Sequence, residues 1–227
     1  MTLIDRPLPR VPGDAVIYVM RHGETIWNAI GRRQGHRDSP LTLTGFAQAR
    51  AVGGGLARAL AEESEGPEAF EMISSPLGRC WQTAVIVAQQ AGLPPERIAL
   101  EPRLAEVGYG HWEGLDDEQA RAGHAEAWER RERDKWRIAP PGGGESYRAV
   151  AERVAAWLSE VPAGARLIVV CHGVSGRILR GLYDGASPEA VMMDEEPQDA
   201  FFRLSGGAIA RLEALEHRAR NRLRAGC

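Results

Sequence analysis

The feature that most constrains the fold is an apolar run, residues 15–20, that leads directly into Arg21-His22-Gly23. Six apolar or aromatic residues bounded by glycines at positions 13 and 23 are typical of a buried strand. Ligands of α/β proteins bind at the edge of the sheet where such strands end. The run therefore predicts a buried strand that places an arginine and a histidine at a ligand-binding edge.

A second apolar run, residues 166–171, ends in the same way, at His172-Gly173. Strands and helices alternate through the rest of the chain. This alternation predicts an α/β fold, a three-layer α/β/α sandwich with a mostly parallel central sheet. Further strands are expected over 69–73 and 98–100, and a closing hairpin over 200–204 and 208–212. Helices are expected over 42–63, 76–90, 146–160 and 174–183. Ser74-Ser75-Pro76 is expected to cap and open the second of these helices, and Gly53-Gly54-Gly55 in the first is expected to serve close helix packing.

Residues 109–141 depart from the alternation, because they are charged and helical with oppositely charged pairs four residues apart. We expect this segment to be a helical insertion that covers the active-site edge of the sheet. The rest of residues 15–216 is expected to form a single domain around it. Residues 1–14 are expected to be a flexible extension and residues 217–227 a basic tail.

Composition excludes several classes of function. A net charge of −3 argues against nucleic acid as the main partner. No apolar run approaches the roughly 20 residues that a membrane span needs, so no membrane partner is expected. The three cysteines are widely spaced and form no C-x-x-C pair, which indicates a reducing compartment and no structural zinc. We expect a soluble cytoplasmic protein, with a homodimer left open.

The polar residues at the strand ends have a shared chemistry. Two imidazoles, His22 and His172, lie 150 residues apart in the chain, and Arg21, Arg79 and Glu106 also follow predicted strands. If these edges converge, the guanidinium groups can bind the oxygens of a phosphate monoester. One imidazole can then attack the phosphorus while the carboxylic acid protonates the leaving oxygen. Two arginines and a protonated second histidine could supply the positive charge, so no metal ion is required.

The motifs occur in one order along most of the chain. They are Arg21-His22-Gly23-Glu24-Thr25, Gly31-Arg32-Arg33-Gln34-Gly35, Ser75-Pro76-Leu77-Gly78-Arg79, Gly144-Glu145-Ser146 and Cys171-His172-Gly173. Together with Glu106, this arrangement resembles the histidine phosphatase superfamily, also called the phosphoglycerate mutase-like family. The resemblance extends from Tyr18 to about Gly176.

The resemblance implies a role for each residue of the predicted site. His22 would be the nucleophile and form a phosphohistidine that water later hydrolyses. Arg21, Arg79 and His172 would hold the phosphoryl group. Glu106 would be the proton donor and afterwards the base.

Further contacts to the substrate are also implied. Asn28, Gln34 and Gly35 would contact the phosphate or the rest of the substrate. The backbone amide of Val174, at the start of a helix, could donate to an anion. No metal ion and no cofactor are expected, and the partner is a small phosphorylated metabolite.

Within the family, the same core either hydrolyses phosphomonoesters or moves a phosphoryl group within a sugar acid. The mutases typically carry Asn-Leu-Phe-Thr-Gly-Trp after the first motif, whereas this chain has Gly31-Arg32-Arg33-Gln34-Gly35-His36. That sequence and the short segment between Glu106 and Gly142 favour the phosphatase branch. A phosphoglycerate mutase is the alternative, and a binder of phosphorylated ligands without turnover is a weaker one.

Other conspicuous residues are given structural roles. Glu145 is expected to orient the loop and helix start around it rather than react. Cys171 is expected to be a small buried hydrophobe. The histidines outside the motifs are expected to lie on the surface or pack, and several aromatic residues to lie in the core. They are His36, His111, His124 and His217, and Tyr109, Trp112, Trp128 and Trp136.

Overall fold

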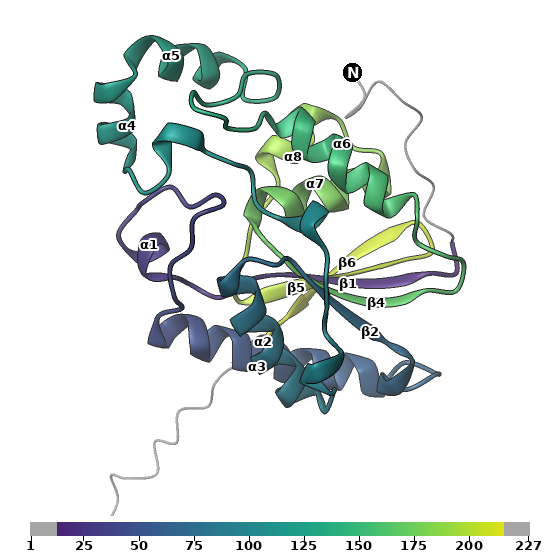
Figure 1. Cartoon of the computed structure of the whole chain (residues 1–227). Helices are drawn as coiled ribbons and strands as arrows, with labels where there is room; N and C mark the ends of the chain where they lie inside the picture. Colours follow the sequence, from purple (N-terminus) through teal and green to yellow (C-terminus); the bar gives the residue numbers. More distant parts are fainter. Residues whose placement is uncertain (1–12, 216–227) are drawn as a thin grey trace, which may run out of the picture.

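The computed structural model describes residues 13–215, in which six strands form one sheet in the order β3-β2-β4-β1-β5-β6 (Figure 1). β1, β2, β3 and β4 run parallel, whereas β5 is antiparallel to both β1 and β6. The predicted mostly parallel sheet and its closing hairpin are therefore confirmed. The strands are β1 (Val16–Arg21), β2 (Glu71–Ser74), β3 (Ala99–Leu100), β4 (Arg166–Cys171), β5 (Ala200–Ser205) and β6 (Ala208–Glu213).

Helices cover both faces of the sheet, which makes the predicted three-layer sandwich (Figure 1). α2 (Leu43–Ala61) and α3 (Gly78–Ala91) lie on one face. α6 (Tyr147–Leu158), α7 (Gly173–Asp184) and the short α8 (Pro188–Met193) lie on the other. None of the helices within residues 13–215 is long and apolar enough to cross a membrane.

The continuous apolar run of β1 is explained by these two layers. Val16, Tyr18 and Met20 belong to the hydrophobic core between the sheet and α2 and α3. Ile17 and Val19 alternate with them and belong to the core against α6 and α7. Because successive strand residues point to opposite faces, a strand covered on both sides must be apolar throughout.

The start of α3 differs from the prediction. Ser75-Pro76 was expected to cap and open this helix, but the helix begins at Gly78 with Leu77 at the N-cap and no side-chain cap. The Ser75 hydroxyl is instead 2.7 Å from Nε2 of His172. Ser75 therefore contacts His172, the residue that follows β4, and the expectation that it caps the helix was wrong.

The predicted helical insertion contains α4 (Asp117–Gly123) and α5 (Ala125–Arg133). In Figure 1 these helices lie on the same side of the molecule as α1 (Ile26–Ala29), which follows the end of β1. Two backbone hydrogen bonds link Arg33, in the loop after α1, to Gly114 and Leu115 of the insertion. The insertion thus covers the edge of the sheet where β1 ends, as expected.

Two parts of the sequence-based description fall partly or wholly outside the structure. Of the expected N-terminal extension, residues 1–12 lie outside the described residues. The expected basic tail, residues 217–227, lies entirely outside them.

Candidate active site

The neighbouring parallel strands β1 and β4 bring the two His-Gly pairs together. Arg21 and Cys171 are register partners, and the amide of His22 donates to the carbonyl of Cys171 over 3.0 Å. The imidazole rings of His22 and His172 consequently lie with their centroids 5.2 Å apart, and both side chains are buried. Two residues far apart in the chain thus lie side by side.

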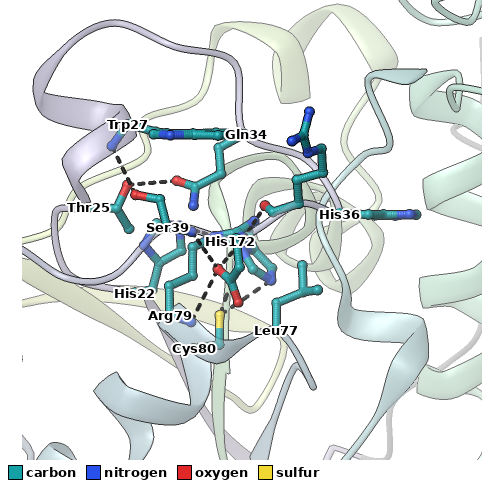
Figure 2. A network of polar contacts seen from close by, with 12 residues as sticks. His22, Thr25, Trp27, Gln34, His36, Ser39, Leu77, Arg79, Cys80 and His172 are labelled. Carbon is teal, nitrogen blue, oxygen red and sulfur yellow. Dashed lines mark hydrogen bonds and ion pairs between the residues drawn. The ribbon is translucent and has the colours of Figure 1, made fainter. Parts of the chain in front are cut away.

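The chemical state of His22 follows from its two hydrogen bonds. Its Nδ1 lies 2.8 Å from the carbonyl oxygen of Gly23, which only accepts, so Nδ1 carries the proton. The Nε–H of Arg79 donates to Nε2 of His22 over 3.2 Å, so Nε2 presents a lone pair (Figure 2). Burial, Arg79 and Arg21 all lower the pKa of His22 well below its usual range. The imidazole of His22 is therefore neutral, and its Nε2 lone pair is directed toward Arg79.

The loop that follows α1 holds Arg79 in place. The guanidinium of Arg79 is fully buried. Its Nη1 lies 3.0 Å from Oδ1 of Asp38, and its Nη2 donates to the carbonyl of Gly35 over 2.8 Å. The third nitrogen is the Nε that faces His22. Each edge of the guanidinium thus has a fixed partner, which orients the planar cation toward His22.

His172 has neutral partners. Its Nε2 is 2.7 Å from Oγ of Ser75. It is also 3.3 Å from Sγ of Cys80 (Figure 2). Burial, followed by the charge of Arg79, lowers the pKa of His172 well below its usual range. The expected protonated second histidine is thus a neutral imidazole here, so the positive charge of the site comes from the arginines.

Glu106 is buried at the N-terminus of α7. Its Oε1 accepts from the amides of Val107 (2.9 Å) and Ser175 (3.3 Å), and its Oε2 accepts from the amide of Val174 over 3.2 Å. Burial and the charge of Glu196 raise the pKa of Glu106, although Arg79 and the backbone donors oppose this. A carboxyl group with a raised pKa can serve as a general acid. The Val174 amide, expected to contact substrate, binds Glu106 in this structure.

The other predicted contact residues lie in α1 and in the loop that follows it. Oδ1 of Asn28 accepts from the amide of Thr25 over 3.1 Å, which closes the first turn of α1. Oε1 of Gln34 accepts from the Thr25 hydroxyl over 2.6 Å. Nε2 of Gln34 is buried and has no partner among the described residues, so it is a donor available to an anion. Gly35 contributes its carbonyl to Arg79 instead.

A close approach of two backbones explains the glycine after the nucleophile. A Cβ at Gly23 would collide with the backbone of Gly45 near the start of α2. α2 itself begins after Thr42, whose hydroxyl accepts from the amide of Gly45. The amide of Gly23 donates to the Thr83 hydroxyl of α3 over 3.1 Å. The loop that carries His22 is therefore packed directly onto both helices of that face.

His36 and Glu145 form a second polar cluster behind Glu106. Nε2 of His36 is 2.9 Å from the Glu106 carbonyl and 3.4 Å from Oε2 of Glu145, and the Glu145 hydrogen bond raises the pKa of His36. Burial acts to raise the pKa of Glu145, but His36 and Arg153 hold it at about 2. Arg153 also donates to the Glu106 carbonyl over 3.0 Å. His36, expected to be a plain surface or packing residue, thus contacts the backbone of the candidate acid.

Sequence reasoning missed two residues in the loop between α8 and β5. Gln198 donates to the carbonyl of His22 over 3.1 Å, and the backbone carbonyl of Glu196 accepts from Arg21 over 2.8 Å. The predicted closing hairpin could have indicated that this loop lies near His22. A strand antiparallel to β1 begins where β1 ends, so the residues before it must emerge at the edge that carries His22.

Comparison with known proteins identifies the family. The profile of the histidine phosphatase superfamily (branch 1) matches residues 17–195. A protein named "Probable phosphoglycerate mutase GpmB" from Enterobacter sp. (strain 638) is 37% identical over 167 residues, covering 70% of each chain. The 2,3-bisphosphoglycerate-dependent phosphoglycerate mutase of Methylobacterium radiotolerans is 35% identical over 183 residues, 78% of this chain and 83% of that protein.

Solved structures agree with this result. The α-ribazole phosphatase from Shigella flexneri superposes with a TM-score of 0.70 at 28% identity, covering 88% of this chain and 95% of that chain. The relatives thus carry the names of phosphatases and of mutases. Since the profile spans most of the chain and the fold superposes over nearly all of it, this protein belongs to the histidine phosphatase superfamily.

Proposed function

We propose that the protein hydrolyses phosphomonoesters of small metabolites through a phosphohistidine at His22, without a metal ion. The observation that carries the proposal is the state of His22. Its Nδ1–H is held by the Gly23 carbonyl, and its Nε2 lone pair faces the guanidinium of Arg79. A neutral imidazole aimed at a cationic group that binds phosphoryl oxygens is suited to attack on phosphorus.

In the first step, Nε2 of His22 forms a bond to phosphorus as the bond from phosphorus to the leaving oxygen breaks. Glu106 gives its proton to that oxygen, so the alcohol departs neutral. In the second step, Glu106 accepts a proton from water, the water oxygen bonds to phosphorus, and the bond to His22 breaks. Inorganic phosphate and the free imidazole are the products.

The remaining residues of the site stabilise the charge of the transferred group. Arg21 and Arg79 bind phosphoryl oxygens, because a guanidinium offers paired donors of the right spacing. Nε2 of Gln34, which has no partner within residues 13–215, adds a neutral donor. His172, whose imidazole is neutral, donates a hydrogen bond rather than a charge. Two fixed cations thereby provide the electrostatic stabilisation that a metal ion provides in other phosphatases.

A phosphoglycerate mutase is the second candidate, and its support is the names of the sequence relatives. Hydrolysis is preferred because the loop over residues 31–36 has the phosphatase form. We further propose a cytoplasmic location. Cys80 and Cys171 are not joined in a disulfide, which suits a reducing compartment.

The test uses purified protein with 4-nitrophenyl phosphate in the presence of EDTA. Turnover that survives the chelator is the expected result, whereas its loss would contradict the metal-free mechanism. Rapid quench with ³²P-labelled substrate should trap label on His22, and full turnover by His22→Ala would remove it as the nucleophile.

A second assay separates the two activities. The protein is given 3-phosphoglycerate together with 2,3-bisphosphoglycerate, and both free phosphate and 2-phosphoglycerate are measured. Release of phosphate supports the phosphatase. Rapid isomerisation without release would establish the mutase instead.

A further inference from the structure

The loop between α8 and β5 carries three consecutive acidic residues, 194–196, and arginines from several elements hold them. Asp194 pairs with Arg180 of α7 at 2.5 Å, and Glu195 pairs with Arg211 of β6 at 3.0 Å. These two ion pairs anchor the loop on either side of the sheet's end. The third carboxylate, that of Glu196, is thereby held at the mouth of the candidate active site.

Glu196 lies between two arginines and the start of α7. Its Oε1 is 3.1 Å from Nε of Arg177, and its Oε2 is 3.6 Å from Nη1 of Arg21. A Cβ at Gly173, the residue after His172, would collide with the Glu196 carboxylate. The carboxylate therefore occupies a position at a helix N-terminus and beside two cations, where an anionic group of a ligand would otherwise be favoured.

Arg177 is held in this arrangement by further contacts. It donates from Nη1 to the Met192 carbonyl over 3.2 Å and from Nη2 to the Tyr147 hydroxyl over 3.3 Å. Its guanidinium also stacks on the Tyr147 ring, 5.4 Å from the centroid. Arg177 is thus a fixed cation at the edge of the site, and Glu196 neutralises it.

We propose that Glu196 determines specificity: it selects phosphomonoesters whose leaving group is uncharged or cationic and disfavours those that carry a second anionic group. This inference rests on the proposed phosphatase activity. A phosphoryl group held by Arg21 and Arg79 brings the remainder of the substrate next to the Glu196 carboxylate. A second anion there meets a like charge in a partly buried setting, where screening by solvent is weak.

Glu196 has a second effect on the same site. After burial, its charge is the largest cause of the raised pKa of Glu106. A single carboxylate thus both repels anionic leaving groups and keeps the candidate acid protonated to higher pH. Replacing it by the isosteric amide should change both properties together, which loss of packing alone would not do.

The experiment measures binding and turnover in wild type and in Glu196→Gln. Calorimetry gives the Kd of phenylphosphonate and of 4-carboxyphenylphosphonate, which differ only by a remote carboxylate. We expect the wild type to bind the carboxylated compound about tenfold more weakly and Glu196→Gln to reduce that ratio to about threefold or less.

The corresponding aryl phosphates should show the same change in the ratio of kcat/KM. The alkaline limb of the kcat/KM profile of Glu196→Gln should move to lower pH.

Glu195→Gln is the matched control, because it removes the same charge from the adjacent residue, whose partner is Arg211. It should keep the wild-type ratio. An unchanged ratio in Glu196→Gln, or equal binding of the two compounds by wild type, would overturn the inference while leaving the phosphatase intact. If the wild type hydrolyses neither aryl phosphate, the proposed function fails and the inference fails with it.

Discussion

The guanidinium of Arg79 has a fixed orientation in the candidate active site. Arg79 faces the lone pair of His22 through Nε and is clamped through its other nitrogens by Asp38 and Gly35. A lysine in its place would keep the charge but would offer a single point donor, which cannot reach all three partners at once.

Arg79→Lys should therefore lower kcat/KM for 4-nitrophenyl phosphate by about 100-fold or more, which is the scale for losing one aligned donor at a developing charge. Steady-state kinetics measure the loss. Arg103→Lys is the control, since it makes the same exchange in a surface ion pair with Glu101 and Glu160. A loss under threefold in Arg79→Lys would mean that charge alone suffices.

Glu106 is suited to proton donation because burial raises the pKa of its carboxyl group. A general acid matters most when the leaving alcohol is a weak acid. Glu106→Gln should thus reduce kcat for an alkyl phosphate by about 10²–10⁴-fold, and should affect 4-nitrophenyl phosphate far less. With the alkyl substrate, the pH profile of kcat of this variant should also lack the alkaline limb. Equal losses with both substrates would contradict the role of acid.

How far the sequence predicts the site depends on where each residue lies. His22 and His172 follow apolar strands of a mostly parallel sheet, so both could be placed at the same edge of it. That β1 and β4 are neighbours is known only from the structure. Gln198 and Glu196 lie in a loop without a motif, and their placement depends on the register of β5 beside β1. His36 was missed because its neighbours, Glu145 and the Glu106 carbonyl, become neighbours only when the insertion folds back.

At the scale of elements, two helices on one face are packed unusually closely. A Cβ at Gly53 of α2 would lie 2.7 Å from Cβ of Gln90 and 3.0 Å from Cα of Val87, both on α3. The glycine run in α2 was expected to serve close helix packing, and this geometry bears it out. Because α3 also carries Arg79, the packing positions a residue of the active site.

Gly53→Ala should destabilise the protein by about 1–3 kcal/mol, because the overpacking exceeds the gain of about 1 kcal/mol in helix propensity. Gly54→Ala is the matched control: its Cβ would meet the flexible end of the Leu215 side chain, which can move aside. Urea unfolding measures both variants. If Gly53→Ala is as stable as Gly54→Ala, the close contact between α2 and α3 does not exclude a methyl group at position 53.

The long elements could be predicted because their apolar residues follow a clear period. The short elements and the helix starts could not, because they lack such a pattern or because a polar side chain binds a distant partner instead of the helix end. β1 and β4 could be identified because both of their faces are covered. The start of α3 could not, since Ser75 binds His172 rather than capping the helix. α1 has four residues and no buried side chain, so no apolar pattern marks it.

At the scale of the whole molecule, the three layers enclose two imidazoles that must remain neutral. Burial lowers the pKa of His22 and of His172 well below the value of about 6.5 for an exposed histidine. Below pH 6.5 the unfolded chain therefore binds more protons than the folded protein, and the free energy of unfolding falls as the pH falls. His36 acts oppositely, because its raised pKa stabilises the fold at low pH and this contribution is lost as the pH rises through it.

His22→Asn tests this linkage. Each buried neutral imidazole contributes up to about 1.4 kcal/mol per pH unit to the slope of stability between its folded pKa and pH 6.5. The variant should therefore have a shallower slope between pH 6.5 and 5 than the wild type, by about one proton. Urea unfolding at closely spaced pH values gives both slopes, and each protein should keep a constant offset from the other above pH 7.5, where His22 binds no proton in either state. Parallel curves down to pH 5 would show that His22 is not held neutral by the fold.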